Sequence, residues 1–153
     1  MATKAEEIYC VAEKLEGILS DYFANNYSLI DEYLQGEIEV SAEVAEAVGQ
    51  HFSRLKMLTG FYFPTLRSSL SRVTSAASSS YAALHAYHKA SRDGKEQLAQ
   101  ILDTSVVDLK DAFEAMKTNI LIVGEREQVG SKLALFKRQP KAVGASRVLT
   151  VAA

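Results

Sequence analysis

The chain is poor in cysteine and proline, and each scarcity narrows the class of protein to which it belongs. Cys10 is the only cysteine in 153 residues, so neither an intramolecular disulfide nor a thiolate zinc site can form. We therefore expect a reducing compartment, namely the cytoplasm. Two prolines leave room for long helices, and the chain shows no sheet signature, so the sequence predicts an all-α protein.

Long apolar runs are also missing. The longest uncharged run within the expected helices, from Val73 to His88, is rich in Ser and Ala. The first residues are acidic and lack the apolar core of a signal peptide. We therefore expect neither a membrane span nor a membrane partner.

The sequence lacks the motifs of the common enzyme sites. It contains no Gly-x-Ser-x-Gly elbow, no phosphate-binding glycine loop and no Glu-x-x-His motif. His85 and His88 have the three-residue spacing of a ligand pair, but no carboxylate lies between Val73 and His88 to complete a metal site. We expect histidines on a helix face here, and we expect no enzyme, no metal and no cofactor.

Helical periodicity is what the chain does contain. Apolar and small residues recur at alternating steps of four and three in one segment, which is the spacing of a single helix face. They are Leu66, Leu70, Val73, Ala77, Ser80, Leu84, Tyr87 and Ser91. The centre of the segment, residues 76–80, holds only Ala and Ser, so we expect a neighbouring helix to approach closely there.

The same periodicity and its flanking cap signals divide the rest of the chain. Thr3 and Glu6 form a capping box at the start of a helix that we expect to end before Gly36. Pro64 favours a break or sharp kink between two further helices. The expected helices are 4–35, a shorter one from Ser41 to Gly60, 64–92, and 94–123, which we expect to end near Gly124. Similar lengths and a tight joint at Asp93-Gly94 predict an antiparallel bundle of three long helices and one shorter helix within residues 1–127.

Charge is distributed unevenly along the chain. Residues 1–50 hold eleven Asp or Glu against two Lys, whereas residues 131–153 hold five basic residues and no acidic one. We define residues 128–153 as the C-terminal arm and expect it to extend from the bundle. Its basic residues are candidates for contact with phosphates or with the acidic first helix of the same or another copy.

The aromatic run at 61–63 is a second candidate for binding, because three adjacent aromatic side chains cannot all face one core. Packing around the Pro64 bend is the alternative. The candidate partner-binding residues are Phe61, Tyr62, Phe63, Lys132, Phe136, Lys137, Arg138, Lys141 and Arg147.

These features favour a non-catalytic assembly or adaptor protein that acts through protein-protein contacts with itself or a larger assembly. Two alternatives remain open. One is a nucleic-acid accessory protein that uses the basic arm. The other is a small inhibitor whose acidic first helix covers a basic surface on an enzyme.

Overall fold

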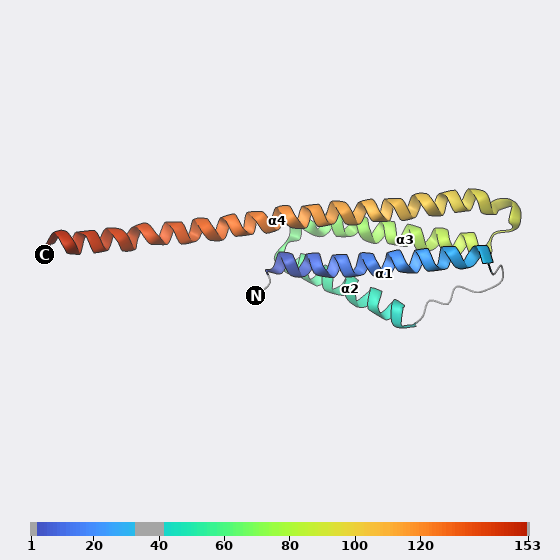
Figure 1. The fold of residues 1–153 in the computed structure, drawn as a ribbon, viewed down its shortest axis with the longest axis horizontal. Helices are drawn as coiled ribbons and strands as arrows, with labels where there is room; N and C mark the ends of the chain where they lie inside the picture. The colour runs from blue at the N-terminus through green and yellow to red at the C-terminus, as the bar shows by residue number, and fades with distance from the viewer. Residues whose placement is uncertain (1–2, 33–41, 153) are drawn as a thin grey trace.

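The structure, a computed structural model, describes residues 3–32 and 42–152, with side chains described except at 27–32, 92, 129 and 131–152. Over these ranges the chain forms α-helices and short 3-10 turns, with no strand, which confirms the expected all-α bundle (Figure 1). The helices are α1 (Lys4–Glu32), α2 (Ala42–Tyr62), α3 (Arg67–Lys89) and α4 (Lys95–Ala152). The predicted helix end before Gly36 and the predicted cap at Ser41 lie outside the described residues.

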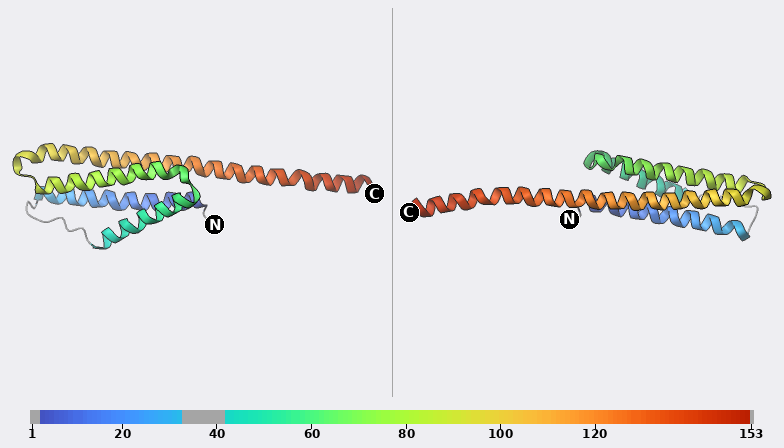
Figure 2. Two further views of the ribbon diagram at one scale, coloured as in Figure 1. Left: turned by 180° about the vertical axis from the view of Figure 1, so that it is seen from behind. Right: turned by 90° about the horizontal axis from the view of Figure 1, so that it is seen from above.

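The helices are arranged antiparallel, with α3 and α4 packed together most extensively. Helix α1 lies against both α2 and α4, while α2 contacts α3 only sparingly. Both figures show α2 diverging from the other helices toward its amino-terminal end (Figures 1 and 2). At the opposite end, α4 continues well past the bundle as a single projecting helix.

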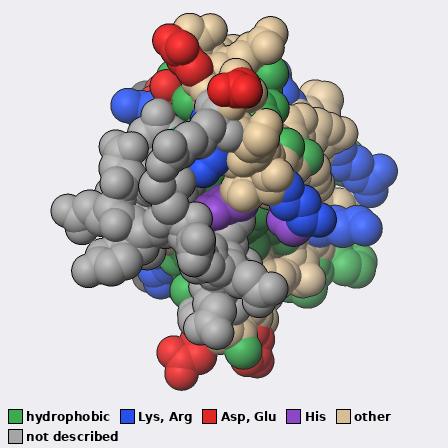
Figure 3. Space-filling model, turned by 90° about the vertical axis from the view of Figure 1, so that its right-hand side faces the viewer, with side chains coloured by type: hydrophobic (Ala, Val, Ile, Leu, Met, Phe, Trp, Pro, Cys, Tyr) green, Lys and Arg blue, Asp and Glu red, His purple; other side chains and the backbone are tan. Residues whose placement is uncertain are grey.

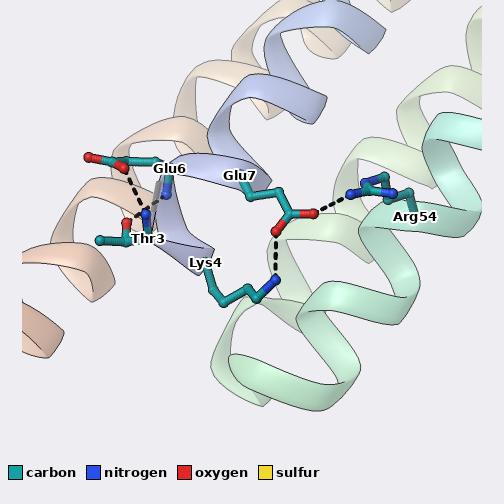
Figure 4. Close-up of polar contacts among 5 residues, drawn as sticks. All are labelled: Thr3, Lys4, Glu6, Glu7 and Arg54. Carbon is teal, nitrogen blue, oxygen red and sulfur yellow. Dashed lines mark hydrogen bonds and ion pairs between the residues drawn. The ribbon is translucent and has the colours of Figure 1, made fainter. Parts of the chain in front are cut away.

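The capping box at the start of α1 is confirmed. The backbone N–H of Glu6 donates to Thr3 Oγ1 at 3.1 Å, and the N–H of Thr3 donates to Glu6 Oε2 at 2.8 Å (Figure 4). Each bond satisfies an N–H that has no partner within the first helical turn. The predicted start of this helix is therefore confirmed.

The chain also breaks at Pro64, as predicted. Helix α2 ends at Tyr62, Phe63 leaves helical geometry at φ −138° and ψ 72°, and the 3-10 turn η1 (Pro64–Leu66) leads into α3. Arg67 Nη2 donates to the carbonyl of Gly60 at 3.3 Å, which ties the end of α2 to the start of α3. Proline is accommodated because the first position of a helix requires no N–H donor.

The predicted face of α3 is the buried face of that helix. Seven of its eight residues, from Leu66 to Tyr87, are buried, and Ser91 is exposed because α3 has already ended at Lys89. Ser80 is completely buried, and its hydroxyl lies 2.9 Å from the carbonyl of Ala76 and 3.0 Å from the carbonyl of Ser105 on α4. A side chain as short as serine reaches a neighbouring backbone only where two helices lie close together. The close approach expected at the small residues is therefore present.

Large side chains from α1 and α4 fill the remaining core. Leu15 and Leu19 on α1 and Phe113 and Met116 on α4 are essentially fully buried. Tyr81 of α3 meets α1 through its ring, whose centroid lies 5.4 Å from that of Tyr22 and 5.2 Å from that of Phe23. Burying each large apolar side chain contributes about 1.5–3 kcal/mol, so this core is the main source of stability.

The prediction that the last helix ends near Gly124 is wrong. Helix α4 runs for 58 residues, through Gly124 and through Pro140, so the C-terminal arm is a continuation of α4. A Cβ atom placed on Gly124 would lie 3.1 Å from Cβ of Ala5, tighter than ordinary van der Waals contact. Gly124 therefore allows the first turn of α1 to pack closely on α4 instead of terminating the helix.

The hairpin between α3 and α4 is slightly longer than the expected two residues. The 3-10 turn η2 (Arg92–Gly94) follows Ser91, and the N–H of Gly94 donates to the carbonyl of Ser91 at 3.1 Å. Ser91, the residue before this turn, makes no side-chain cap bond to it.

Candidate functional site

The aromatic run lies at the end of α2, close to the start of α1. Phe61 is 81% exposed and Tyr62 is 52% exposed, whereas Phe63 packs partly against the core. Met57 lies one turn before Phe61 on the same face of α2 and is also exposed. We define Met57, Phe61 and Tyr62 as the aromatic patch. The expectation that the run cannot be buried as a whole is confirmed, and Phe63 does not belong to the exposed surface.

A charged cluster borders the aromatic patch. Glu7 accepts a hydrogen bond from Lys4 Nζ at 2.8 Å and is also paired with Arg54 of α2 (Figure 4). Hydrogen bonds from Lys4 and then Arg54 lower the pKa of Glu7, and the bond to Glu7 raises the pKa of Lys4. Lys4 Nζ also lies 5.3 Å from the centroid of the Tyr62 ring, within cation–π range. One side of the aromatic patch is thus bordered by the ammonium group of Lys4 and by the carboxylate of Glu7 with which it pairs.

The candidate residues of the arm all belong to the projecting part of α4. Its basic residues are Lys132, Lys137, Arg138, Lys141 and Arg147, and Phe136 lies among them in the sequence. The structure places the backbone of these residues beyond the bundle, on the side where the chain begins (Figure 1). It therefore brings the start of the arm and the aromatic patch to the same end of the molecule.

The two histidines on α3 lie at the other end of the bundle, near the α3–α4 hairpin. His85 is exposed, while His88 is partly buried with Nε2 unpaired among the described residues. Burial, followed by Lys95 and His85, lowers the pKa of His88. Seen from this end, histidine side chains lie beside those of Lys and Arg (Figure 3). The described part of the chain holds no group of three His, Cys, Asp or Glu residues arranged to bind a metal ion.

An ion pair between α1 and α4 is a feature that sequence reasoning missed. Lys117 Nζ lies 2.8 Å from Glu16 Oε2 and 2.9 Å from Glu114 Oε1, and the side chains of Lys117 and Glu16 are largely buried. The hydrogen bonds that Lys117 donates to Glu16 and then to Glu114 raise the pKa of Lys117 well above its ordinary range. The i,i+3 spacing of Glu114 and Lys117 was a visible signal, but the contact with Glu16 depends on how α1 and α4 are rotated toward each other.

Sequence reasoning also missed the apolar surface between α1 and α4. Val107 and Leu121 on α4 are 56% and 57% exposed. Cys10 is exposed on α1 and lines a hollow between the two helices, to which Leu121 of α4 also contributes. We call this surface the α1–α4 groove. Its only sequence signal was a set of apolar residues on α4 in addition to those of the buried face.

No helix in the described ranges combines the length and apolar character needed to cross a bilayer. Comparison with protein-family models, with curated proteins and with solved structures finds no match to this chain. The class that the fold defines is an antiparallel four-helix bundle with one helix extended beyond it. Any functional conclusion therefore depends on the surfaces described above.

Proposed function

We propose that this chain is a non-catalytic protein-binding module, an assembly or adaptor protein that binds partners through exposed helix surfaces. One observation carries the proposal: Phe61 and Tyr62 are exposed together at the end of α2, beside a charged cluster. Aromatic side chains supply a large contact area and are enriched at the centres of protein interfaces.

The surroundings of the patch also support this proposal. Tyr62 lies beneath Lys4, and next to it Glu7 of α1 pairs with Arg54 of α2 as well as with Lys4 of its own helix. A binding surface held by ordered helices loses less conformational entropy on association than a mobile loop does. The bundle thus provides a rigid base for an aromatic anchor.

The experiment compares co-purification by the full-length chain and by variants from the cells that make the protein. We expect the double variant Phe61→Ser, Tyr62→Ser to recover at least about tenfold less of a specific partner than the native chain does. Aromatic side chains at the centre of an interface often contribute about 2 kcal/mol or more to the binding free energy. Ile101→Ser removes an exposed apolar side chain of α4 that lies outside both the aromatic patch and the two hollows between α1 and α4, and it serves as the control. Equal recovery of every partner by the double variant and the native chain, with equal melting temperatures, would overturn the proposal.

A further inference from the structure

The α1–α4 groove consists of two hollows along the line where these helices meet. One has a volume of about 350 Å³ and is lined in part by Phe23, Val107 and Phe113. The other, of about 320 Å³, is lined in part by Ala5, Ile120 and Leu121 and reaches Gln128. The groove therefore extends from the middle of the bundle to the point where the arm begins.

The charged residues around this groove are mainly acidic. The acidic residues that line the two hollows are Glu6, Glu16, Asp103 and Glu125. Lys110 is the basic residue among the described lining residues, and Lys117 is already paired with Glu16. An apolar floor between acidic edges is complementary to a helix that carries apolar and basic residues.

The arm of this same chain has that character. Residues 131–153 contain five basic residues and no acidic one, and Leu133, Phe136 and Val143 recur in the sequence at the spacing of one helix face. In the two ribbon figures, none of the other described helices runs beside the projecting part of α4 (Figures 1 and 2). A helix gains most of its stability from packing an apolar face, so this segment requires a partner surface.

The groove that the arm fits cannot be its own. Helix α4 is continuous from Lys95 to Ala152, so the arm points away from its own bundle. Folding back onto α1 would require α4 to break and reverse direction. The fitting surface must therefore come from another molecule.

We propose that the arm of one copy lies in the α1–α4 groove of a second copy, and that the two copies do this reciprocally in an antiparallel, two-fold dimer. The groove runs alongside α4, and the arm is the continuation of α4. When the arm of one copy lies antiparallel in the groove of a second copy, two-fold symmetry therefore places the arm of the second copy in the groove of the first. This proposal rests on the proposed function and names one partner, a second copy of the chain.

Charge reversal provides the test, carried out on the full-length chain. The arm variant carries Lys132→Glu, Lys137→Glu and Arg138→Glu; the groove variant carries Asp103→Lys and Glu125→Lys. Asp103 and Glu125 are exposed, so their replacement leaves the core intact. A matched control carries Lys14→Glu, Lys56→Glu and Arg72→Glu, three exposed basic residues outside the two hollows and the arm.

Light scattering should give the native chain and the control a mass of twice 16.8 kDa. Each reversal alone should weaken dimerisation at least about tenfold, because like charges then face each other. The arm variant has an acidic arm and an acidic groove, whereas the groove variant keeps its basic arm and has a basic groove. An equimolar mixture should therefore form heterodimers that dissociate as salt concentration rises.

Three outcomes would overturn the inference: a native chain that is monomeric at all concentrations, single variants that dimerise like the control, or a mixture that remains monomeric. Open-ended larger assemblies would overturn the reciprocal arrangement. None of these results affects binding of other proteins at Phe61 and Tyr62, so failure of this inference is distinguishable from failure of the proposed function.

Discussion

Ser80 provides the sharpest test of how α3 and α4 pack. It is completely buried, and its hydroxyl lies 3.0 Å from the carbonyl of Ser105 on the facing helix. Replacing it with Leu puts three carbon atoms in place of the single hydroxyl oxygen, at a point where the two backbones already lie close together. Ser79 is the next residue along the chain and is exposed, so Ser79→Leu introduces the same side chain without the clash.

The expected magnitudes follow from two effects. Overpacking a well-packed core costs about 1–3 kcal/mol, and loss of the hydroxyl's hydrogen bonds adds about 0.5–1.5 kcal/mol. We therefore expect Ser80→Leu to lower the free energy of unfolding by roughly 2–4 kcal/mol. Ser80→Ala loses only the hydrogen bonds and gains helix propensity, so its cost should be about 1 kcal/mol or less.

Urea denaturation at equilibrium measures these differences, provided that the slope with denaturant is unchanged. For a domain of this length, the Leu variant should also melt about 5–15 °C lower. Ser79→Leu should remain within about 0.5 kcal/mol of the native chain. If Ser80→Leu proves as stable as Ser79→Leu, the close approach of α3 and α4 is refuted.

Three further predictions concern single positions. A Cβ atom added at Gly17 would meet no neighbouring atom, so Gly17→Ala should raise the free energy of unfolding by about 0.5–1 kcal/mol. Gly124→Val should lower it, because a Cβ atom there would press on α1. Equal effects of the two substitutions in urea denaturation would contradict the helix packing. Lys117→Met should lower the free energy of unfolding by about 1–2 kcal/mol at pH 7. Because the ion pairs raise the pKa of Lys117 above its ordinary 10.5, this loss should shrink as pH rises above 10.5; a loss that is independent of pH would refute the ion pair with Glu16. Burial holds the pKa of His88 in the folded chain below its ordinary 6.5, so the unfolded chain binds more protons in acid. The free energy of unfolding should therefore fall as pH drops through 6.5, and His88→Gln should make this fall less steep. An equally steep fall in both chains, measured by denaturation between about pH 7.5 and 5.5, would contradict this role of His88.

Local patterns predicted much of this fold. The capping box at Thr3 and Glu6 and the break at Pro64 depend on residues within one helical turn of each other, so the sequence specifies them directly. The buried face of α3 was equally visible, because its period is a property of one helix. Its close contact with α4 followed from the small residues around Ser80.

Features that depend on how two helices are rotated against each other could not be predicted in this way. Gly124 resembles a helix end in the sequence, yet its role is to admit Ala5 of α1, which lies far away in the chain. The pairing of Lys117 with Glu16 has the same origin. At the candidate site, three adjacent aromatic residues predicted that at least one would be exposed. The sequence could not show that Phe61 is the exposed one and that Phe63 is partly buried, because this depends on the geometry of the turn at Pro64.

We propose above all that the chain acts by binding protein through the aromatic patch. A photo-crosslinking phenylalanine analogue placed at Phe61, in the cells that make the protein, tests it most directly. The same analogue at Ser79, which is exposed on α3, provides the background. We predict discrete protein adducts at position 61 that are absent at position 79. Adducts to nucleic acid alone, or equal adducts at both positions, would contradict the claim.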